Sequence, residues 1–337
     1  MIVIIGSGIS GLSLSYFLSE NGIKNIVIDF KSDVGKLPRS TTLISGKIFK
    51  FFDFIKNEDV LKSFDVANFW YDNEKIFSIK AKNKMYIFDY KKLENKIFKH
   101  IDKNFSNFLF SEKVVDVDLS KNIVFTNKRK LKFEILVDAS GTFSFLANKF
   151  KLFEFKKIFN SFEIFGKFKK RLEDVNLFFD KKFSKEKFGW YINLNDSHAL
   201  VGLIDTKLKI DKFKEFAKKF EVSKIFYEYS HPILFGKLKK YSIKNSLIVG
   251  EAAGLVKPFS LGGITYGIIS SYLAYRSIIN NDIESYDKRI RKVFKKSLFV
   301  GEVVNKILRK KFFAKLVKYF GVNKIVRNLD PDFIYII

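Results

Sequence analysis

A glycine pattern near the start of the chain has the spacing that a phosphate-binding turn requires. Gly6, Gly8 and Gly11, in the stretch GSGISG, lie between an apolar run and a helical pattern. Such glycines allow a tight turn, let a pyrophosphate approach the backbone, and let the helix pack closely on the strand. The helix N-terminus adds free N–H groups. Asp29, after the next apolar run, can accept hydrogen bonds from an adenosine ribose. The pattern predicts a dinucleotide site.

A second glycine-rich stretch, GEAAGLVKPFSLGGITYG, runs from Gly250 to Gly267 and contains five glycines and a proline. It follows the apolar run 247–249 and precedes a helical pattern over 268–278. Glycine permits backbone conformations that side chains forbid, and it lets a ligand approach the backbone closely. We therefore expect a ligand to come close to the main chain here as well.

The scarce residue types exclude several kinds of chemistry. The chain has no cysteine, which excludes disulfides, thiolate zinc sites, iron–sulfur clusters and a catalytic thiol. His100, His198 and His231 are scattered, so no metal site is expected. No apolar run reaches the ~18 residues that span a bilayer, and the N-terminus lacks the basic region of a signal peptide. We expect a cytoplasmic protein, either free or peripheral on the inner face of the membrane.

The chain is strongly basic, with 62 Lys and Arg against 36 Asp and Glu and a net charge of +26. Such a charge attracts nucleic acid, anionic membrane surfaces or acidic proteins. No nucleic-acid motif accompanies it, so nucleic acid is not expected as a partner. Lys, Phe, Ile and Asn are abundant together, which is also what AT-rich coding produces. The 41 phenylalanines suit a site for a long apolar ligand.

The elements that must position these motifs alternate between strand and helix. We expect a strand at Ile2–Ile5, an amphipathic helix to about Glu20 and a strand at Asn25–Ile28. Loop and helix follow over 30–52, a hairpin over 73–90, and a meander of three strands over 108–141 whose third strand ends in DASG. Residues 155–235 are strand-rich, and a strand at 246–249 leads into the second glycine-rich stretch.

The order of these elements predicts an α/β fold: a discontinuous Rossmann-like dinucleotide-binding domain, an inserted β-sheet-rich substrate domain, and a C-terminal helical segment. We assign residues 1–70, 86–150 and 240–290 to the dinucleotide-binding domain, 71–85 and 151–239 to the substrate domain, and 291–337 to the helical region.

The last segment has a helical pattern of apolar positions with basic residues between them. The basic residues are Lys306, Arg309, Lys310, Lys315 and Lys318; the apolar positions are Val300, Val303, Val304, Ile307, Leu308, Phe312, Leu316, Val317 and Phe320. The pattern is typical of a basic amphipathic helix or helix pair. It either lies on an anionic membrane surface or packs on its own domain.

Three separated motifs together resemble a known family. Gly6–Gly11 with Asp29, LVDASGTFSFL (136–146) and the Gly250–Gly267 stretch are similar to flavoproteins of the glutathione-reductase and p-hydroxybenzoate-hydroxylase type. Within that superfamily the chain most resembles the geranylgeranyl reductases, which saturate isoprenoid chains, over nearly its whole length. The family pattern G-D-A-A-G-x-x-x-P-x-x-G-x-G-I corresponds to the residues from Gly250 to Ile264.

The resemblance implies that the dinucleotide is FAD. Glu251 would hydrogen-bond the ribitol, the following glycines would bring N–H groups to the isoalloxazine, and Arg39 would reach a phosphate or the flavin edge. Phe188, Trp190 and Tyr191, in a partial match to the family's substrate motif, would line the isoprenoid pocket. No catalytic acid stands out; the flavin, a water and Tyr191 remain options. The expected cofactor-binding residues are Gly6, Ser7, Gly8, Ile9, Ser10, Gly11, Asp29, Phe30, Arg39, Val115, Gly141, Gly250, Glu251, Gly254, Pro258, Gly262, Gly263 and Ile264.

The chain departs from the family pattern at several positions, and two other functions stay open. Glu251 replaces an Asp, Asp29 replaces a Glu, and the loop after Asp29 has no cysteine. One alternative is an aromatic-ring hydroxylase, although such enzymes carry Asp where this chain has Ser140. The other is a flavin-bearing membrane-surface protein without turnover. For the reductase, the resemblance and the charge imply an isoprenoid lipid substrate and an acidic electron carrier such as ferredoxin.

Overall fold

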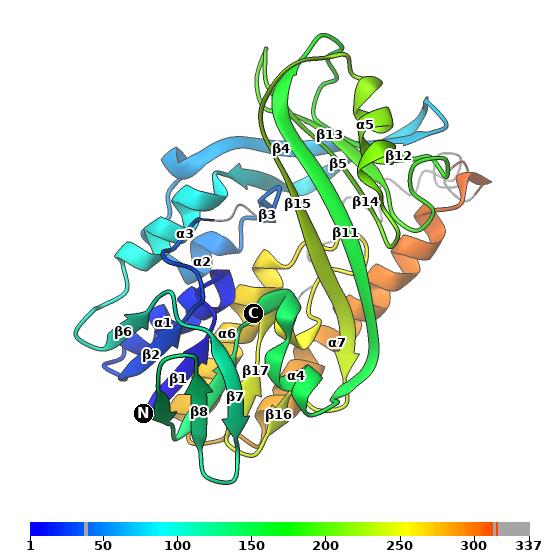
Figure 1. Ribbon diagram of the computed structural model, residues 1–337. Helices are drawn as coiled ribbons and strands as arrows, with labels where there is room; N and C mark the ends of the chain where they lie inside the picture. The colour runs from blue at the N-terminus through cyan, green and yellow to red at the C-terminus, as the bar shows by residue number, and fades with distance from the viewer. Residues whose placement is uncertain (37–39, 313–314, 316–337) are drawn as a thin grey trace.

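The protein consists of a parallel-sheet layer and a larger, curved antiparallel sheet (Figure 1). The computed structural model describes residues 1–36, 40–312 and 315. The parallel sheet has the strand order β16-β17-β10-β1-β2-β6, and the curved sheet the order β15-β11-β14-β13-β12-β4-β5-β3. This is the mixed α/β arrangement that the order of elements predicted.

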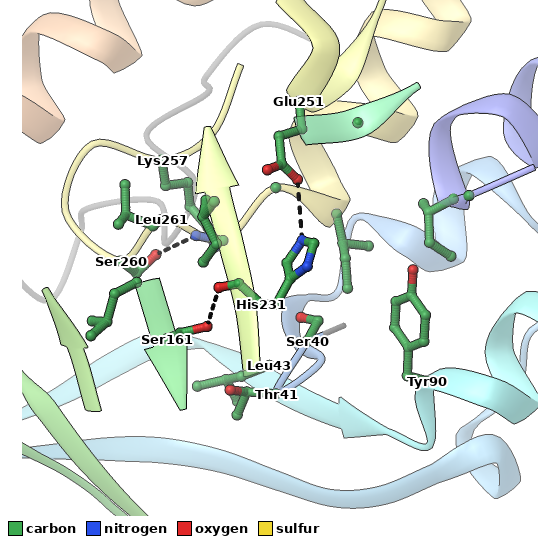
Figure 2. A pocket seen from close by; sticks show the side chains of 18 of the residues that line it. Ser40, Thr41, Leu43, Tyr90, Ser161, His231, Glu251, Lys257, Ser260 and Leu261 are labelled. Carbon is green, nitrogen blue, oxygen red and sulfur yellow. Dashed lines mark hydrogen bonds and ion pairs between the residues drawn. The ribbon is translucent and has the colours of Figure 1, made fainter. Parts of the chain in front are cut away.

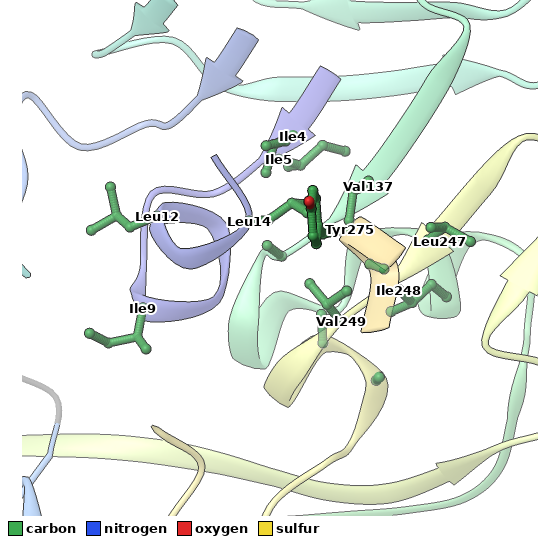
Figure 3. Close-up of a cluster of buried hydrophobic side chains, with 14 of the residues drawn as sticks. Ile4, Ile5, Ile9, Leu12, Leu14, Val137, Leu247, Ile248, Val249 and Tyr275 are labelled. Atoms are coloured by element: carbon green, nitrogen blue, oxygen red, sulfur yellow. The ribbon is translucent and has the colours of Figure 1, made fainter. Parts of the chain in front are cut away.

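The inner strands of the parallel sheet, β1, β2, β10 and β17, are short, mostly apolar and buried on both faces. Its strands are β1 (Ile2–Ile5), β2 (Asn25–Ile28), β6 (Ser106–Leu109), β10 (Ile135–Asp138), β17 (Ser246–Ile248) and the antiparallel edge strand β16 (Ser242–Ile243). Continuous apolar runs are typical of strands covered on both sides. Helices α1 (Ile9–Ser19), α3 (Tyr90–Lys99) and α6 (Ile264–Ile279) pack with this sheet, and Figure 3 shows Leu14 and Tyr275 meeting Ile4 and Val137 in the core.

Helix α1 is buried on nearly all sides instead of being amphipathic as expected. Nine of its eleven residues are buried. Its buried serines fit this setting because their hydroxyls have partners: Ser13 donates to the Ile9 carbonyl oxygen at 2.6 Å, Ser15 to Asn25 Oδ1 at 2.8 Å, and Ser19 to the Tyr16 carbonyl oxygen at 3.1 Å. One face of the helix packs on the parallel sheet, and another packs against α6, so both faces are covered.

The curved sheet carries the longest strands of the molecule. Its strands are β3 (Leu43–Ser45), β4 (Val60–Tyr71), β5 (Glu74–Phe88), β11 (Phe153–Phe168), β12 (Val175–Phe179), β13 (Gly189–Asn193), β14 (Ala199–Asp205) and β15 (Val222–Leu238), of which β4, β5, β11 and β15 are the long ones. All neighbours are antiparallel except β4 and β12. Figure 1 shows β11 and β15 running side by side from this sheet down to the parallel-sheet layer.

The boundary between the two sheets differs from the expected domain division. Residues 60–70 and 86–88, which we assigned to the dinucleotide-binding domain, lie in β4 and β5 of the curved sheet, and β3 also joins it. Residues 73–90 do not form a hairpin by themselves; most of them form β5, which pairs with β4. The cause is the tight turn at Asp72-Asn73, whose residues both have positive φ.

Two further segments differ from the expectations. The meander is β7 (Val114–Asp118), β8 (Ile123–Thr126) and β9 (Lys130–Lys132), and the strand that ends in DASG is a separate fourth one, β10, which enters the parallel sheet. Inside the strand-rich region, α5 (Ile210–Lys218) buries Phe213, Phe216 and Ala217. The short helices α2 (Ile48–Phe51) and α4 (Phe145–Lys149) complete the fold, with single 3-10 turns at Asn57–Asp59, Gly141–Phe143 and Gly250–Ala253.

The C-terminal helix α7 (Tyr286–Leu308) packs on the protein along one face. Its buried residues include Tyr286, Ile290, Phe294 and Gly301. The opposite face leaves Phe299 68% exposed and Val303 and Ile307 each 38% exposed. The expected continuation through Leu316, Val317, Lys318 and Phe320 lies outside the described residues. Among the residues that the structure describes, no helix has the length and apolar character to span a bilayer.

Candidate functional site

The first glycine turn has the close contacts that its sequence requires. Gly6 has φ +102°, and a Cβ there would meet the Ala139 carbonyl; a Cβ on Gly11 would overlap the Gly6 carbonyl oxygen. Both positions therefore need glycine for packing of the protein against itself. Gly8 is different, because a Cβ at Gly8 would meet no protein atom within 4 Å. The space in front of Gly8 belongs to the cavity described below.

Asp29 closes this turn from the end of β2. Its Oδ2 accepts from the backbone N–H of Ser7 at 2.6 Å and from Ser7 Oγ at 2.7 Å, and its Oδ1 accepts from the Lys31 N–H at 2.9 Å. Lys31 Nζ lies 3.7 Å from Oδ2, in an ion pair that is almost fully buried. Each carboxylate oxygen has more than one acceptor position, so Asp29 can hold the turn and still accept from a ribose.

The second glycine stretch begins at the end of β17. Gly254 has φ +72°, and a Cβ there would overlap the backbone of Gly236 on β15. Glu251 Oε1 accepts from Thr142 Oγ1 at 2.7 Å and from the Leu234 N–H at 2.8 Å, while its Oε2 lies 3.9 Å from His231 Nε2. Figure 2 shows this carboxylate facing His231 on the cavity wall. Glu251 thus fastens the parallel-sheet layer to β15 of the curved sheet.

A single cavity of about 750 Å³ joins the two glycine stretches to the curved sheet. One part of its wall is polar and glycine-rich. The other part is aromatic and aliphatic, and it comes from the inner face of the curved sheet and from the 257–263 turn. The apolar wall residues are Phe64, Phe69, Ile79, Leu177, Phe188, Trp190, Ile192, Ile204, Ile233, Phe259 and Leu261, with Val304 and Leu308 of α7. The cavity therefore combines a turn of the phosphate-binding type with an apolar part. We call this apolar part, lined by the residues just listed, the chamber.

Most of the expected site residues lie on this wall. Gly6, Gly8, Ile9, Ser10, Asp29, Phe30, Gly141, Glu251, Gly262, Gly263, Ile264, Phe188 and Trp190 line the cavity. Ser7, Gly11, Gly250, Gly254 and Pro258 are not on the wall. Ser7 holds Asp29, and Gly11, Gly250 and Gly254 stand where a side chain would collide with the protein itself. Arg39 lies outside the described residues.

Two expected residues point away from the cavity. Val115 is 53% exposed, and its neighbour Val114 lines the wall in its place. Tyr191 lies on the far face of the curved sheet, where it packs with Phe168 and Phe220. Strand residues alternate between faces, so Phe188 and Trp190 face the cavity while Tyr191 cannot. Tyr191 is therefore not a cavity residue.

One carboxyl on the wall escaped the sequence analysis. Glu163, on β11, is 2% exposed; its Oε2 accepts from Trp190 Nε1 at 2.7 Å and from Thr41 Oγ1 at 2.5 Å, and its Oε1 accepts from Tyr229 Oη at 2.6 Å. Burial raises the pKa of this carboxyl, although the three donors oppose the shift. The sequence indicated this residue only as an acidic position within the apolar segment SFEIF. Its three partners come from distant segments, so the hydrogen-bond network could not be predicted from the sequence.

The wall has the features that a dinucleotide needs. A Cβ at Gly8 or at Gly141 would meet no protein atom within 4 Å, so a ligand can touch the backbone at both positions. The α1 N-terminus adds free N–H groups behind Gly8. Within residues 1–36, 40–312 and 315, no group of three or more His, Cys, Asp or Glu side chains could hold a metal ion. The open backbone at Gly8 and Gly141 and the α1 N-terminus fit a dinucleotide.

Comparisons with known proteins agree with this geometry. Residues 1–52 match the model of the FAD binding domain family. An uncharacterized protein of Methanocaldococcus jannaschii is 33% identical over 171 residues, which are 47% of this chain and 43% of that relative, so the match spans less than half of either protein. The digeranylgeranylglycerophospholipid reductase of Methanococcus aeolicus is 26% identical over 92% of this chain and 86% of its own length.

Solved structures share the fold over nearly the whole chain. A geranylgeranyl bacteriochlorophyll reductase-like protein from Thermoplasma acidophilum has a TM-score of 0.83 at 15% identity and covers 99% of this chain and 93% of its own. The p-nitrophenol 4-monooxygenase of Pseudomonas putida has a TM-score of 0.77 at 14% identity, with 100% and 98% covered. The chain thus carries an FAD-binding domain, and it shares its fold with a geranylgeranyl bacteriochlorophyll reductase-like protein and with a p-nitrophenol 4-monooxygenase.

Proposed function

We propose that the protein is an FAD-dependent reductase that saturates the double bonds of isoprenoid chains, such as geranylgeranyl groups of membrane lipids or their precursors. The observation that carries this proposal is the cavity, in which a glycine-rich turn opens into an aromatic and aliphatic chamber. The similarity to a digeranylgeranylglycerophospholipid reductase, at 26% identity over 92% of the chain, supports the same substrate class.

The residues of the chain divide between cofactor and substrate. Gly8, Asp29, Gly141 and Glu251 would hold FAD, which supplies hydride when it is bound and reduced. The aromatic wall would hold the alkene chain and exclude water from it, which favours hydride transfer over side reactions. An unactivated double bond has no polar group that the protein could bind. Apolar contacts with Phe69, Phe188 and Trp190 would therefore determine which double bond is reduced.

The proposed partners follow from charge and from the C-terminal helix. A net charge of +26 would attract an acidic electron carrier such as ferredoxin. The exposed apolar residues of α7 would bring the chamber to an anionic membrane surface, where isoprenoid lipids reside. We therefore place the protein at the inner face of the cytoplasmic membrane as a peripheral protein.

The decisive experiment supplies chemically reduced protein, without oxygen, with geranylgeranyl phospholipid or geranylgeranyl diphosphate. We expect mass spectrometry to show one added molecule of hydrogen per saturated bond. A quinone with an isoprenoid tail serves as a rival substrate. If no chain is saturated and an aromatic compound is hydroxylated once oxygen and NADPH are present, the enzyme is a monooxygenase, the activity named for one protein of the same fold.

The two neighbouring aromatics of β13 provide a matched pair of variants. Trp190→Ala enlarges the chamber and should slow saturation by about 10- to 100-fold, because the alkene loses its positioning surface. The flavin content should stay unchanged. Tyr191→Phe alters the opposite face of the same strand and should leave the rate unchanged. Equal rates for all three proteins would place the substrate outside this chamber.

A further inference from the structure

Glu163 is a buried carboxyl on the wall of the apolar chamber, and the roles assigned so far leave it unexplained. β11 carries it to the cavity, with Ser161 beside it on the same face. Three hydrogen-bond donors converge on its two oxygens: Trp190 from β13, Thr41 from the segment before β3, and Tyr229 from β15. A satisfied network of this kind fixes the position of a buried polar group, so the Glu163 carboxyl is held in one place on the cavity wall.

Among the described residues, the carboxyl has no cationic partner that explains its burial. Apart from burial, the groups that act on Glu163 are the donors Thr41, Tyr229 and Trp190, and none of them is a cation. A buried carboxyl without a cation favours its protonated form. The ionisable side chains that share the cavity wall with it are Asp29, Lys31, Asp65, Tyr90, Glu112, Lys113, Tyr229, His231, Glu251 and Lys257, and Tyr227 lies on β15 two residues from Tyr229.

We propose that Glu163 is the proton donor of the site. This proposal rests on the proposed function. In the saturation of a C=C bond, one carbon receives hydride from reduced flavin and the other needs a proton. The O–H bond of Glu163 breaks, the new C–H bond forms, and Glu163 is left as a carboxylate. A proton from solvent then restores the acid, so each turnover consumes one hydride and one proton.

The three donors favour this transfer because they act most strongly on its product. The N–H of Trp190 can only donate, so it marks Oε2 as an acceptor, and the transferable proton belongs on Oε1, which contacts Tyr229 Oη at 2.6 Å. When the proton leaves, Trp190, Thr41 and Tyr229 all donate to an anion, and such hydrogen bonds are about twice as strong as neutral ones. Burial thus favours the protonated acid beforehand, and the donors stabilise the carboxylate afterwards.

The protonation state of Glu163 can be read without any turnover. The chain has two tryptophans, Trp70 and Trp190, so Trp70→Phe leaves Trp190, which is bonded to Glu163, as the sole indole emitter. In that background we expect Trp190 fluorescence to change with pH at a midpoint above the ~4.3 of an ordinary glutamate. Glu163→Gln should remove the change. Tyr229→Phe should move the midpoint upward, because the carboxylate loses a donor.

A matched variant controls for the loss of a buried carboxyl elsewhere. Glu94 is 1% exposed, accepts from Tyr90 Oη and from the Gly35 N–H, and does not line the cavity. Glu94→Gln should leave the Trp190 titration unchanged. If Glu163→Gln gives the same titration as its parent, Glu163 is not the titrating group and the proposal is overturned.

The closing experiment measures saturation by chemically reduced protein without oxygen. Glu163→Gln should lower the rate by about 100-fold or more, the usual contribution of a general acid, with unchanged flavin content and circular dichroism. Glu163→Asp, which keeps an acid, should recover part of the rate. If the parent saturates isoprenoids and Glu163→Gln does so equally fast, this proposal alone falls. A parent that saturates no isoprenoid overturns both the proposed function and this proposal.

Discussion

Gly8 and Gly11 belong to one motif but have different roles. A side chain at Gly11 would overlap the Gly6 carbonyl oxygen, so this glycine serves the contact between α1 and β1. Gly8 has φ −78° and open space in front of it, so a side chain there would be neither strained nor crowded by protein. The fold therefore does not require glycine at this position, and we propose that a bound ligand does.

This difference predicts the effects of two substitutions. Gly8→Val should fold normally and lose most of its FAD, because the valine occupies the place of the pyrophosphate. Gly11→Ala should instead destabilise the protein itself. Flavin absorbance relative to protein and thermal unfolding of the flavin-free proteins measure the two effects. A folded Gly8→Val protein that retains full FAD would contradict the assignment of the phosphate site.

Lys187 connects three elements of the chamber wall. Its ammonium group is buried and donates to the Pro258 carbonyl oxygen and, at 3.3 Å, to that of Phe259; Asn305 Oδ1 of α7 lies 3.5 Å away. Burial is the main cause that lowers the pKa of Lys187 to about 7, and the nearby Arg309 adds to the shift. The lysine thus ties the start of β13 to the turn at Pro258 and to α7.

The low pKa predicts a specific pH dependence of stability. Between about pH 7 and the ~10.4 of an unfolded lysine, the unfolded chain binds a proton that the folded protein does not, so stability rises with pH. The rise should be on the order of a few kcal/mol. Lys187→Met should abolish it. Urea unfolding of the parent protein and of Lys187→Met at pH 7 and pH 9.5 gives the change in the free energy of unfolding with pH for each protein. The same change in both proteins would show that Lys187 titrates normally.

Helix α7 packs inward along one face and leaves apolar residues exposed on the other. Val304 and Leu308 close the chamber, and a Cβ on Gly301 would collide with Pro258. Phe299, Val303 and Ile307 follow each other at intervals of four residues and remain accessible. Packing on the protein and binding to an anionic membrane surface are therefore compatible roles for this helix, because each uses a different face of it.

The two faces can be separated by mutation. Phe299→Ser with Ile307→Ser should change the free energy of unfolding by less than about 1 kcal/mol and strongly reduce binding to vesicles that contain anionic lipid. Truncation before Ser297 removes part of the chamber wall and should destabilise the whole protein. Co-sedimentation and thermal unfolding measure the outcomes. Full vesicle binding by the double variant would exclude this face as the membrane contact.

At the scale of the whole molecule, the charge should govern encounters with an electron donor. A net charge of +26 attracts an acidic carrier over distances comparable with the Debye length, which shrinks from ~10 Å at 0.1 M salt to ~3 Å at 1 M. Flavin reduction by such a carrier should therefore slow by about tenfold or more over this range. Stopped-flow absorbance measures the rate, with photoreduction as the control. Rapid reduction by NADPH that is independent of salt would contradict this donor class.

Local patterns in the sequence determined the nucleotide-binding layer. The strands Ile2–Ile5 and Asn25–Ile28 have the expected bounds, and the helix between them ends one residue before the expected position. The reason is that tight turns, continuous apolar runs and glycines at close contacts depend on residues near each other in the chain. The cofactor class followed from the same short motifs and the family resemblance, and most of the residues expected to bind the cofactor line the cavity.

Only the tertiary structure decided the composition of the chamber. Whether Trp190 or Tyr191 faces the cavity depends on strand register, and a shift of one residue exchanges the two faces. For the same reason the sequence analysis expected Val115 at the cofactor, whereas its neighbour Val114 lines the cavity. Glu163 meets Thr41, Trp190 and Tyr229 only because residues 122, 27 and 66 positions away fold onto β11. Long-range pairing of this kind leaves no periodic signal in the sequence, because each partner is set by the packing of other elements.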